Sequence, residues 1–101
     1  TRRSSDLMAG YLIFYYVLEE GEIARIATAH SVRRQGAASQ MFRKLLDFCR
    51  EQKITRIMLE VRENNEAARQ FYGKCGFTKD GIRRNYYENP KENAVLMSVN
   101  L

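Results

Sequence analysis

The sequence predicts one α/β domain over residues 1–101, with a mixed central sheet and the element order β-β-α-β-α-β-β. Its opening part has two β-prone runs joined by a Glu-Glu-Gly-Glu turn, the pattern of an antiparallel hairpin. Two later stretches space their apolar residues at helical intervals. Further β-prone runs separate and follow these stretches, and no repeat or linker interrupts the order.

The first half of the chain should form the hairpin and a long helix. Met8–Leu18 is rich in aromatic and β-branched residues, which favour a strand. Glu19–Glu22 supplies the turn, and Glu22–His30 is the returning strand. A helix is expected from about Gly36 to Gln52. Its apolar stripe consists of Met41, Phe42, Leu45, Leu46, Phe48 and Cys49.

A third strand, Ile54–Arg62, has apolar residues on both faces, which is typical of a central strand covered on both sides. We place Ile57, Leu59 and Val61 on one face, with Ile54 and Met58 flanking the other. A strand, a helix and a further strand in this order form a right-handed crossover between parallel strands.

The second helix should begin at Asn64–Glu66, because Asn is a good N-cap residue. Its stripe consists of Ala67, Ala68, Phe71, Tyr72 and Cys75. Gly76 is placed to end it as the C′ residue. Phe77–Tyr87, interrupted near Gly81, and Ala94–Leu101 are the last strands, with a turn between them at Glu88–Asn93.

Composition narrows the class of protein. Hydrophobic residues make up 45% of the chain, enough for a core, and the net charge of +5 favours acidic partners. The basic residues are spread out, which argues for a site rather than a nucleic-acid-binding arm. Cys49 and Cys75 lie in helical stripes without metal-ligand spacing, so we predict buried, reduced thiols and no metal, with a disulfide as the alternative. No apolar run or signal peptide points to a membrane, so a cytoplasmic location is expected.

The loop before the first long helix is a candidate phosphate site. It consists of Arg33, Arg34, Gln35, Gly36, Ala37, Ala38 and Ser39. The first amides of a helix lack internal partners and carry partial positive charge, and small residues let an anion approach them. The alternative is a tight turn with solvated arginines. The spacing is neither that of a P-loop nor that of the dinucleotide motif.

Glu60 is a lone carboxylate in the apolar strand Ile54–Arg62. Burial of an unpaired carboxylate costs free energy or raises its pKa, and a raised pKa suits a general base. The alternative is an ion pair with a neighbour such as Arg25 or Arg84, since ion pairs also perturb pKa values.

Tyr72 and Asn65 each have a structural interpretation as well as a functional one. Tyr72 can be a core aromatic with a solvated hydroxyl, although Phe71 beside it fills the core more naturally. Asn65 can simply cap the second helix.

Several motifs together resemble the GCN5-related N-acetyltransferase (GNAT) family. Arg33-x-x-Gly36-x-Ala38 is similar to its R/Q-x-x-G-x-G/A loop, with Ala in the last small position. The stretch from Ala68 through Tyr72 to Gly76-Phe77 resembles its A-x-x-x-Y-x-x-x-G-F signature.

Two further segments resemble the RimI-type branch, which acetylates the N-terminal alanine of ribosomal proteins. These are Leu59-Glu60-Val61-Arg62 and the R-x-N-Y-Y segment Arg83–Tyr87 with its following Ala94-x-x-Met97. The alternative for Arg83–Tyr87 is an aromatic edge strand whose charges block aggregation.

The resemblance covers roughly Met8 to Leu101 and implies the acyl-CoA N-acyltransferase fold with its N-terminal strand and helices missing. In the family those elements cover one face of the sheet and form part of the acceptor wall. The resemblance therefore implies either an incomplete chain or a partner that supplies the cover, and a homodimer is one such arrangement.

The resemblance also implies site residues and an activity. Acetyl-CoA would be the donor and a protein N-terminus, such as that of a ribosomal protein, the acceptor. The loop from Arg33 to Ser39 would hold the pyrophosphate. The pantetheine would lie along the backbone of Ile26, Ala27 and Thr28 and contact Asn65. Glu60 would be the base, acting through water, and Tyr72 the acid that protonates the CoA thiolate.

Two other functions stay open at the level of sequence. The acceptor can instead be a lysine or a small-molecule amine, because the elements that select the acceptor are those that the resemblance finds missing. The chain can also be a non-catalytic module that binds CoA or RNA through its basic surface.

Overall fold

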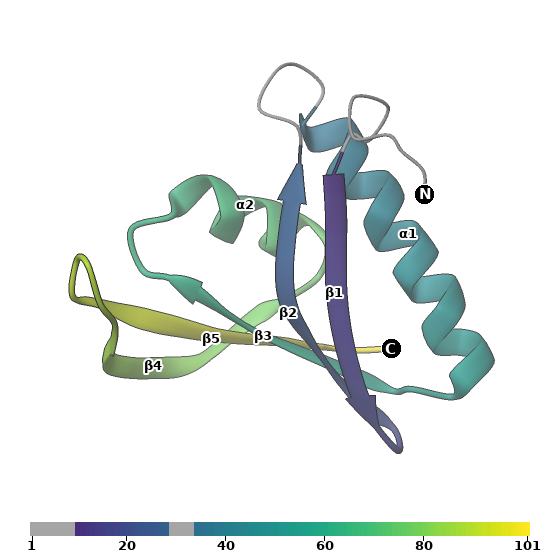
Figure 1. Cartoon of the computed structure of the whole chain (residues 1–101). Helices are drawn as coiled ribbons and strands as arrows, with labels where there is room; N and C mark the ends of the chain where they lie inside the picture. The colour runs from purple at the N-terminus through teal and green to yellow at the C-terminus, as the bar shows by residue number, and fades with distance from the viewer. Residues whose placement is uncertain (1–9, 29–33) are drawn as a thin grey trace.

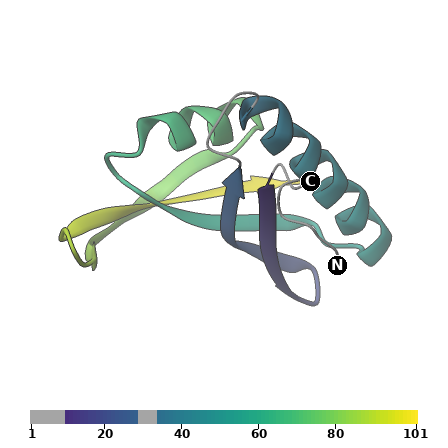
Figure 2. The same cartoon turned by 45° about the horizontal axis from the view of Figure 1, so that its top comes forward.

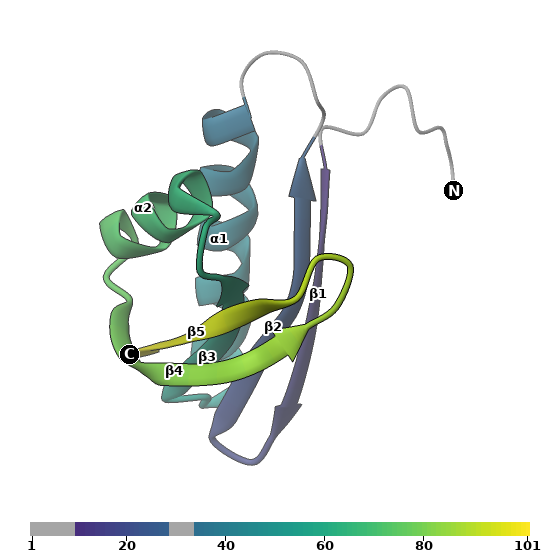
Figure 3. The same cartoon turned by 90° about the vertical axis from the view of Figure 1, so that its left-hand side faces the viewer.

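The computed structural model describes residues 10–28 and 34–101. Its elements follow the predicted order, with ends that differ by a few residues: β1 Gly10–Val17, β2 Glu20–Thr28, α1 Arg34–Gln52, β3 Arg56–Arg62, α2 Glu66–Lys74, β4 Thr78–Tyr87 and β5 Glu92–Asn100. Both helices lie on one side of the sheet (Figure 3). The other side, called the open face below, carries no helix within the described ranges.

The five strands form one sheet in the order β1-β2-β3-β5-β4 (Figure 1). The hairpin β1–β2 is antiparallel, and so are the pairs β3–β5 and β5–β4. The pair β2–β3 is parallel, with α1 as the crossover between the two strands. The predicted fold class, the parallel crossover and the central position of β3 are therefore confirmed.

The core lies between the sheet and the two helices. Ile57 and Cys49 are fully buried, and the core cluster also contains Phe42 and Leu45 of α1. Burying a side chain such as Ile57 contributes roughly 1.5–3 kcal/mol to folding. The prediction that β3 is covered on both faces is wrong for the described chain. Ile57, Leu59 and Val61 are buried on the helix side, whereas Met58 and Glu60 are only half-buried on the open face.

Ile54 also departs from its predicted place. It precedes β3, is buried, and joins the core cluster on the helix side instead of flanking Met58. The chain leaves α1 through Lys53, which has a positive φ of 60°, and this turn redirects Ile54 toward the core.

The boundaries of α2 follow the predicted chemistry. The Oδ1 atom of Asn65 accepts a hydrogen bond of 3.2 Å from the Ala68 amide, as an N-cap residue does. Gly76 has a φ of +100°, the left-handed conformation expected of the C′ residue after a helix. Both predictions are confirmed, and they fix the orientation of the helix that carries Tyr72.

We expect two glycines to respond in opposite ways to alanine. A methyl group on Gly21 of β2 would overlap the ring of Phe14, whereas one on Gly73 of α2 would meet nothing within 4 Å. Gly21→Ala should therefore lower the free energy of unfolding by about 1–3 kcal/mol. Gly73→Ala should raise it by roughly 0.5–1 kcal/mol, because alanine is the better helix former.

Urea denaturation of the two variants and the wild type measures both effects. Equal shifts in the two variants would contradict the packing described around Phe14.

Candidate functional site

The strands β2 and β3 diverge after a short paired segment. Pairing runs only from Glu20–Arg56 to Ile23–Leu59. Beyond it β2 continues to Thr28 and β3 to Arg62, and Figures 1 and 2 show the two strands moving apart. Among the described residues, the backbone groups that face this gap have no strand partner. An unpaired strand edge can take up an extended ligand through main-chain hydrogen bonds.

The predicted segment Ile26–Thr28 lies on this free edge. On its other side it pairs with β1, with Leu12 opposite Ile26, Tyr11 opposite Ala27 and Gly10 opposite Thr28. One edge of the segment is therefore held by the hairpin while the other edge faces the gap.

The predicted phosphate loop lies between β2 and α1. Arg33 falls outside the described residues, as do the side chains of residues 34–37. The helix begins at Arg34, so Arg34, Gln35, Gly36 and Ala37 form its first turn and Ala38 and Ser39 follow. Ala38 is buried and Ser39 half-buried. The first turn contains no acidic residue, so no side-chain carboxylate there opposes an anion at the helix terminus.

Glu60 lies on β3 just beyond the last residue paired with β2. Its side chain is 21% exposed, and its Oε2 atom lies 3.4 Å from Nη1 of Arg83 on β4. The guanidinium of Arg83 also lies over the ring of Tyr86, 5.0 Å from its centroid, and the nearby Glu60 carboxylate raises the pKa of Tyr86. Glu60 is therefore paired with Arg83 and lies close to Tyr86, both of β4.

Arg84 was one expected ion-pair partner of Glu60, and this expectation is wrong: among the described residues Glu60 pairs with Arg83. Ala94 of β5 lies opposite both Arg62 of β3 and Arg83 of β4, so these residues share the open face with Glu60. Arg83, the last residue of β4 paired before the irregularity in its register with β5, is the residue that pairs with Glu60. The side chain of Arg25, the other partner considered, lies outside the described part of the chain.

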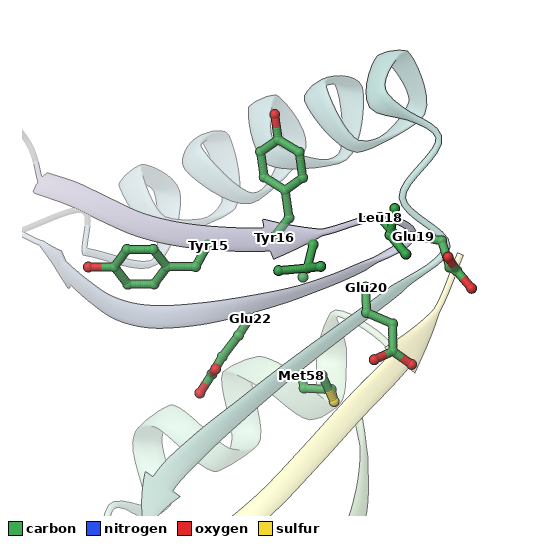
Figure 4. Close-up of a pocket in the computed structure, with 9 residues that line it drawn as sticks. Tyr15, Tyr16, Leu18, Glu19, Glu20, Glu22 and Met58 are labelled. Atoms are coloured by element: carbon green, nitrogen blue, oxygen red, sulfur yellow. The ribbon is translucent and has the colours of Figure 1, made fainter.

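Glu60 borders a cavity of about 280 Å³ on the open face, together with Glu22, Met58, Arg83 and Leu96 among others. A second hollow of about 520 Å³ adjoins it, sharing Glu22 and Met58 (Figure 4). Tyr15 and Glu20 from the β1–β2 hairpin also line this second hollow. Several carboxylates thus face the open side of a chain whose net charge is +5.

Tyr72 of α2 is 6% exposed and belongs to the core cluster, whereas Phe71 is only half-buried. The expectation that Phe71 fills the core in place of Tyr72 is therefore wrong. The Tyr72 ring packs against Phe77 as well as Phe71, with ring centroids 5.6 and 5.7 Å apart. Burial, followed by the charges of Cys75 and Tyr87, raises the pKa of Tyr72 to about 12. Its hydroxyl therefore keeps its proton at neutral pH.

The two cysteines differ in burial. Cys49 is buried as predicted, whereas Cys75 is half-buried, and both are free thiols. Burial raises the pKa of each thiol, so both stay protonated at neutral pH. Because the thiolate is the reactive form of cysteine, neither is a ready nucleophile.

Residues 83–87 of β4 place side chains near Glu60. The sequence motifs gave these side chains no role at the site. Arg83 pairs with the carboxylate and lies over the ring of Tyr86, and Tyr87 packs against Tyr86 with ring centroids 5.0 Å apart. The signal in the sequence is the adjacent pair Tyr86-Tyr87 after charged residues, a pattern that plain strand alternation does not explain.

Within the part of the chain that the structure describes, no group of three or more His, Cys, Asp or Glu side chains is placed to hold a metal ion. No helix in that part is both long and apolar enough to span a membrane.

Comparisons with known proteins agree with this architecture. The sequence pattern described as "Acetyltransferase (GNAT) family" matches residues 4–77. The [ribosomal protein bS18]-alanine N-acetyltransferase of Salmonella typhimurium is 33% identical over 98 residues, which cover 95% of this chain and 66% of the relative.

Solved structures show the same likeness. The ribosomal-protein-S18-alanine N-acetyltransferase of Escherichia coli superposes with a TM-score of 0.85 at 32% identity, covering 97% of this chain and 64% of that one. Arabidopsis thaliana Naa50, solved with the bisubstrate analogue CoA-Ac-MVNAL, gives a TM-score of 0.81 at 26% identity, with 92% and 66% covered. The chain thus spans about two thirds of the length of these relatives. The family match extends from residue 4 through β1, β2, α1, β3 and α2, and the chain therefore belongs to the acetyltransferase (GNAT) family.

Proposed function

We propose that this chain transfers an acetyl group from acetyl-CoA to the α-amine of a protein N-terminus. The observation that carries the proposal is the gap between β2 and β3, with Glu60 beside it and the first turn of α1 following β2. The named relatives support the acceptor class, because the Salmonella and Escherichia coli proteins are ribosomal-protein alanine N-acetyltransferases.

The residues around the gap fit acetyl-CoA as a ligand. The free edge at Ile26, Ala27 and Thr28 offers main-chain groups to the pantetheine amides. The first turn of α1, which begins at Arg34, offers free amides to the pyrophosphate, and we assign the motif from Arg33 to Ser39 to this group. Asn65 uses Oδ1 for its cap, and we assign its remaining amide group to the pantetheine region.

The reaction requires one proton acceptor and one proton donor, because only the unprotonated amine is a nucleophile. The amine nitrogen attacks the thioester carbonyl directly in a ternary complex, so a C–N bond forms as the C–S bond breaks. Glu60 takes the proton from the amine through a water molecule. Tyr72, which holds its proton at neutral pH, gives one to the departing sulfur. No acyl-cysteine is needed, which agrees with the protonated state of both thiols.

The open face favours an amine acceptor over a nucleic acid. Glu22, Glu60 and Asp80 line the same cavity as Arg56 and Arg83, which pair with Asp80 and Glu60, so Glu22 adds a carboxylate that would attract an ammonium group and repel a phosphate. A lysine or small-molecule amine is the alternative acceptor, since the same charges would attract it.

We expect Gly36→Glu to weaken acetyl-CoA binding at least about tenfold, because a carboxylate in the first turn of α1 would repel the pyrophosphate. Calorimetric titration measures the dissociation constant. Gly73→Glu is the matched control, because Gly73 is an exposed helical glycine with open space around it. Equal affinities for the two variants would remove the loop from the proposed site.

Tyr72→Phe should lower turnover by roughly 10²-fold or more while leaving acetyl-CoA affinity nearly unchanged, because it removes a proton donor and keeps the ring. The assay uses a peptide with a free N-terminal alanine and one whose N-terminus is blocked but which contains lysine. We expect acetylation of the first peptide alone.

Tyr16→Phe is the control, since its ring packs on Phe48 of α1, 5.4 Å between centroids. A Tyr72→Phe enzyme with wild-type turnover would exclude the acid role. Acetylation of the blocked peptide would transfer the proposal to a lysine acceptor.

Tyr72 should also make stability depend on pH in the alkaline range. Below pH 10 the tyrosine is protonated in both the folded and the unfolded chain. As the pH rises from 10 toward about 12, the unfolded chain loses this proton first, so the free energy of unfolding falls. The full difference corresponds to roughly 2–3 kcal/mol. Urea titrations between about pH 9 and about pH 11 should show a steeper decline for wild type than for Tyr72→Phe. Parallel declines would show that burial does not hold the proton.

A further inference from the structure

The strand β4 contains a bulge that places Tyr86 beside Glu60. Arg83 pairs with Ala94 and Tyr87 with Glu92, so residues 84–86 of β4 lie opposite Asn93 alone on β5. Asn85, inside the bulge, has a positive φ of 52°. A bulge of this kind re-aims side chains that regular alternation would send to the other face. Here it brings the Tyr86 ring beneath the guanidinium of Arg83, 5.0 Å from the ring centroid, and Arg83 pairs with Glu60 at 3.4 Å.

Asn93 fills the space opposite the bulge and satisfies its backbone. Its Oδ1 atom accepts a hydrogen bond of 2.9 Å from the Asn85 amide. Its side-chain amide donates to Oε1 of Glu63 at 3.2 Å, and its carbonyl accepts the Glu63 amide at 3.0 Å. The bulge is thereby joined to the segment that links β3 to α2.

Arg62 holds the turn that follows the bulge. Its guanidinium donates to the carbonyls of Glu88 and Pro90, both at 3.2 Å, and to Oε1 of Glu92 at 3.1 Å. It also lies over the ring of Tyr87, 4.3 Å from the centroid. Tyr87 in turn packs edge-on against Tyr86. A line of contacts therefore runs from Arg62 through the two tyrosines to Arg83, which pairs with Glu60.

Glu92 completes the arrangement from the β5 side. Its side chain is only 10% exposed and pairs with Arg62 through Oε1. Its Oε2 accepts a 2.6 Å hydrogen bond from the Asn64 amide, which directly precedes the N-cap of α2. The Asn64 amide and the Arg62 guanidinium together lower the pKa of Glu92, so the carboxylate stays charged well below neutral pH.

We propose that Arg62, Glu92 and Asn93, the β4–β5 clamp, are positioning residues that fix the bulge so that Tyr86 engages Glu60 and orients the proposed base. The catalytic consequence rests on the proposed acetyl transfer, whereas the placement of Tyr86 does not. The clamp joins three segments: the end of β3, the start of α2 and the turn from β4 to β5.

The shape of the guanidinium makes a sharp test available. Arg62 serves two carbonyls and a carboxylate at once, and it stacks on a ring with its flat face. Lysine keeps the charge but has neither the planar fork nor the flat face. Arg62→Lys should therefore fail to hold the turn even though the net charge is unchanged.

The placement of Tyr86 can be read without any enzymatic assay. The charged groups near Tyr86 are Glu60 of β3, Arg83 of β4 and Glu22 of β2, and Glu60 is the largest cause of its raised pKa. Carbon-13 NMR of Cζ in labelled tyrosine follows the hydroxyl at neutral pH and through its titration. Tyr86→Phe assigns the resonance.

We expect Arg62→Lys and Glu92→Gln each to shift the Tyr86 resonance at neutral pH and to bring its pKa back toward the ordinary value of 10.0. Arg50→Lys is the matched control, because Arg50 pairs with Asp47 at 2.9 Å on the exposed side of α1. It should leave the Tyr86 resonance unchanged. The two clamp variants break different bonds, so either one decides the question if the other fails to fold.

The proposal also predicts that loss of the clamp lowers kcat without weakening the binding of acetyl-CoA. Arg62→Lys should lower kcat for the acceptor peptide roughly tenfold or more, because the base loses its orientation, while the affinity for acetyl-CoA stays within about twofold. An unchanged Tyr86 resonance in folded clamp variants would overturn the proposal. A shifted resonance with wild-type kcat would overturn the catalytic consequence. A wild-type chain that transfers no acetyl group would instead refute the proposed function, and the NMR result would still decide the role of the clamp.

Discussion

The parallel pairing of β2 with β3 stops at Ile23 and Leu59, and the rest of the site depends on that limit. The strands stay close enough at one end to share the core residues Ile23, Ile57 and Leu59. At the other end the two strands no longer pair with each other, and each is hydrogen-bonded to one other strand of the sheet. β3 is held there by β5, and β2 by β1, which keeps both strands extended while the gap stays open. The opening is therefore a product of the sheet register and requires no flexible loop.

The same divergence explains why Glu60 can be a reactive group inside a mostly apolar strand. Val61, the next residue, is buried against the helices, and Leu59 before it is also buried. Glu60 points to the open face, where no described helix covers it and where Arg83 and Tyr86 reach it from β4. A carboxylate with these partners avoids the cost of an unpaired buried charge while remaining next to the gap.

The sequence was informative where a local rule decides the structure. The element order was predicted correctly from features that lie within short stretches of sequence. These are the spacing of the apolar residues, the N-cap at Asn65 and the C′ glycine at Gly76. The errors concern pairings between elements. Arg83 and not Arg84 meets Glu60, because the register between β4 and β5 decides which residue shares its face. Tyr72 and not Phe71 enters the core, because the angle of α2 on the sheet decides which ring is covered. The bulge at residues 84–86 depends on Asn93, which lies on the next strand.

The burial of Tyr72 both packs its ring into the core and keeps its hydroxyl protonated. A proposed proton donor must keep its proton until the thiolate forms, and a tyrosine buried among Phe71 and Phe77 does so because its charged form is poorly solvated there. The same desolvation makes proton transfer costly, since the phenolate that remains is also poorly solvated. The donor role therefore requires that the phenolate be short-lived or that the proton be replaced quickly. In the proposed reaction Glu60 of β3 would receive the proton of the amine, and return of that proton to the phenolate would restore Tyr72. Under the proposed mechanism, the burial of the acid and the openness of the site between β2 and β3 are complementary conditions for the same reaction.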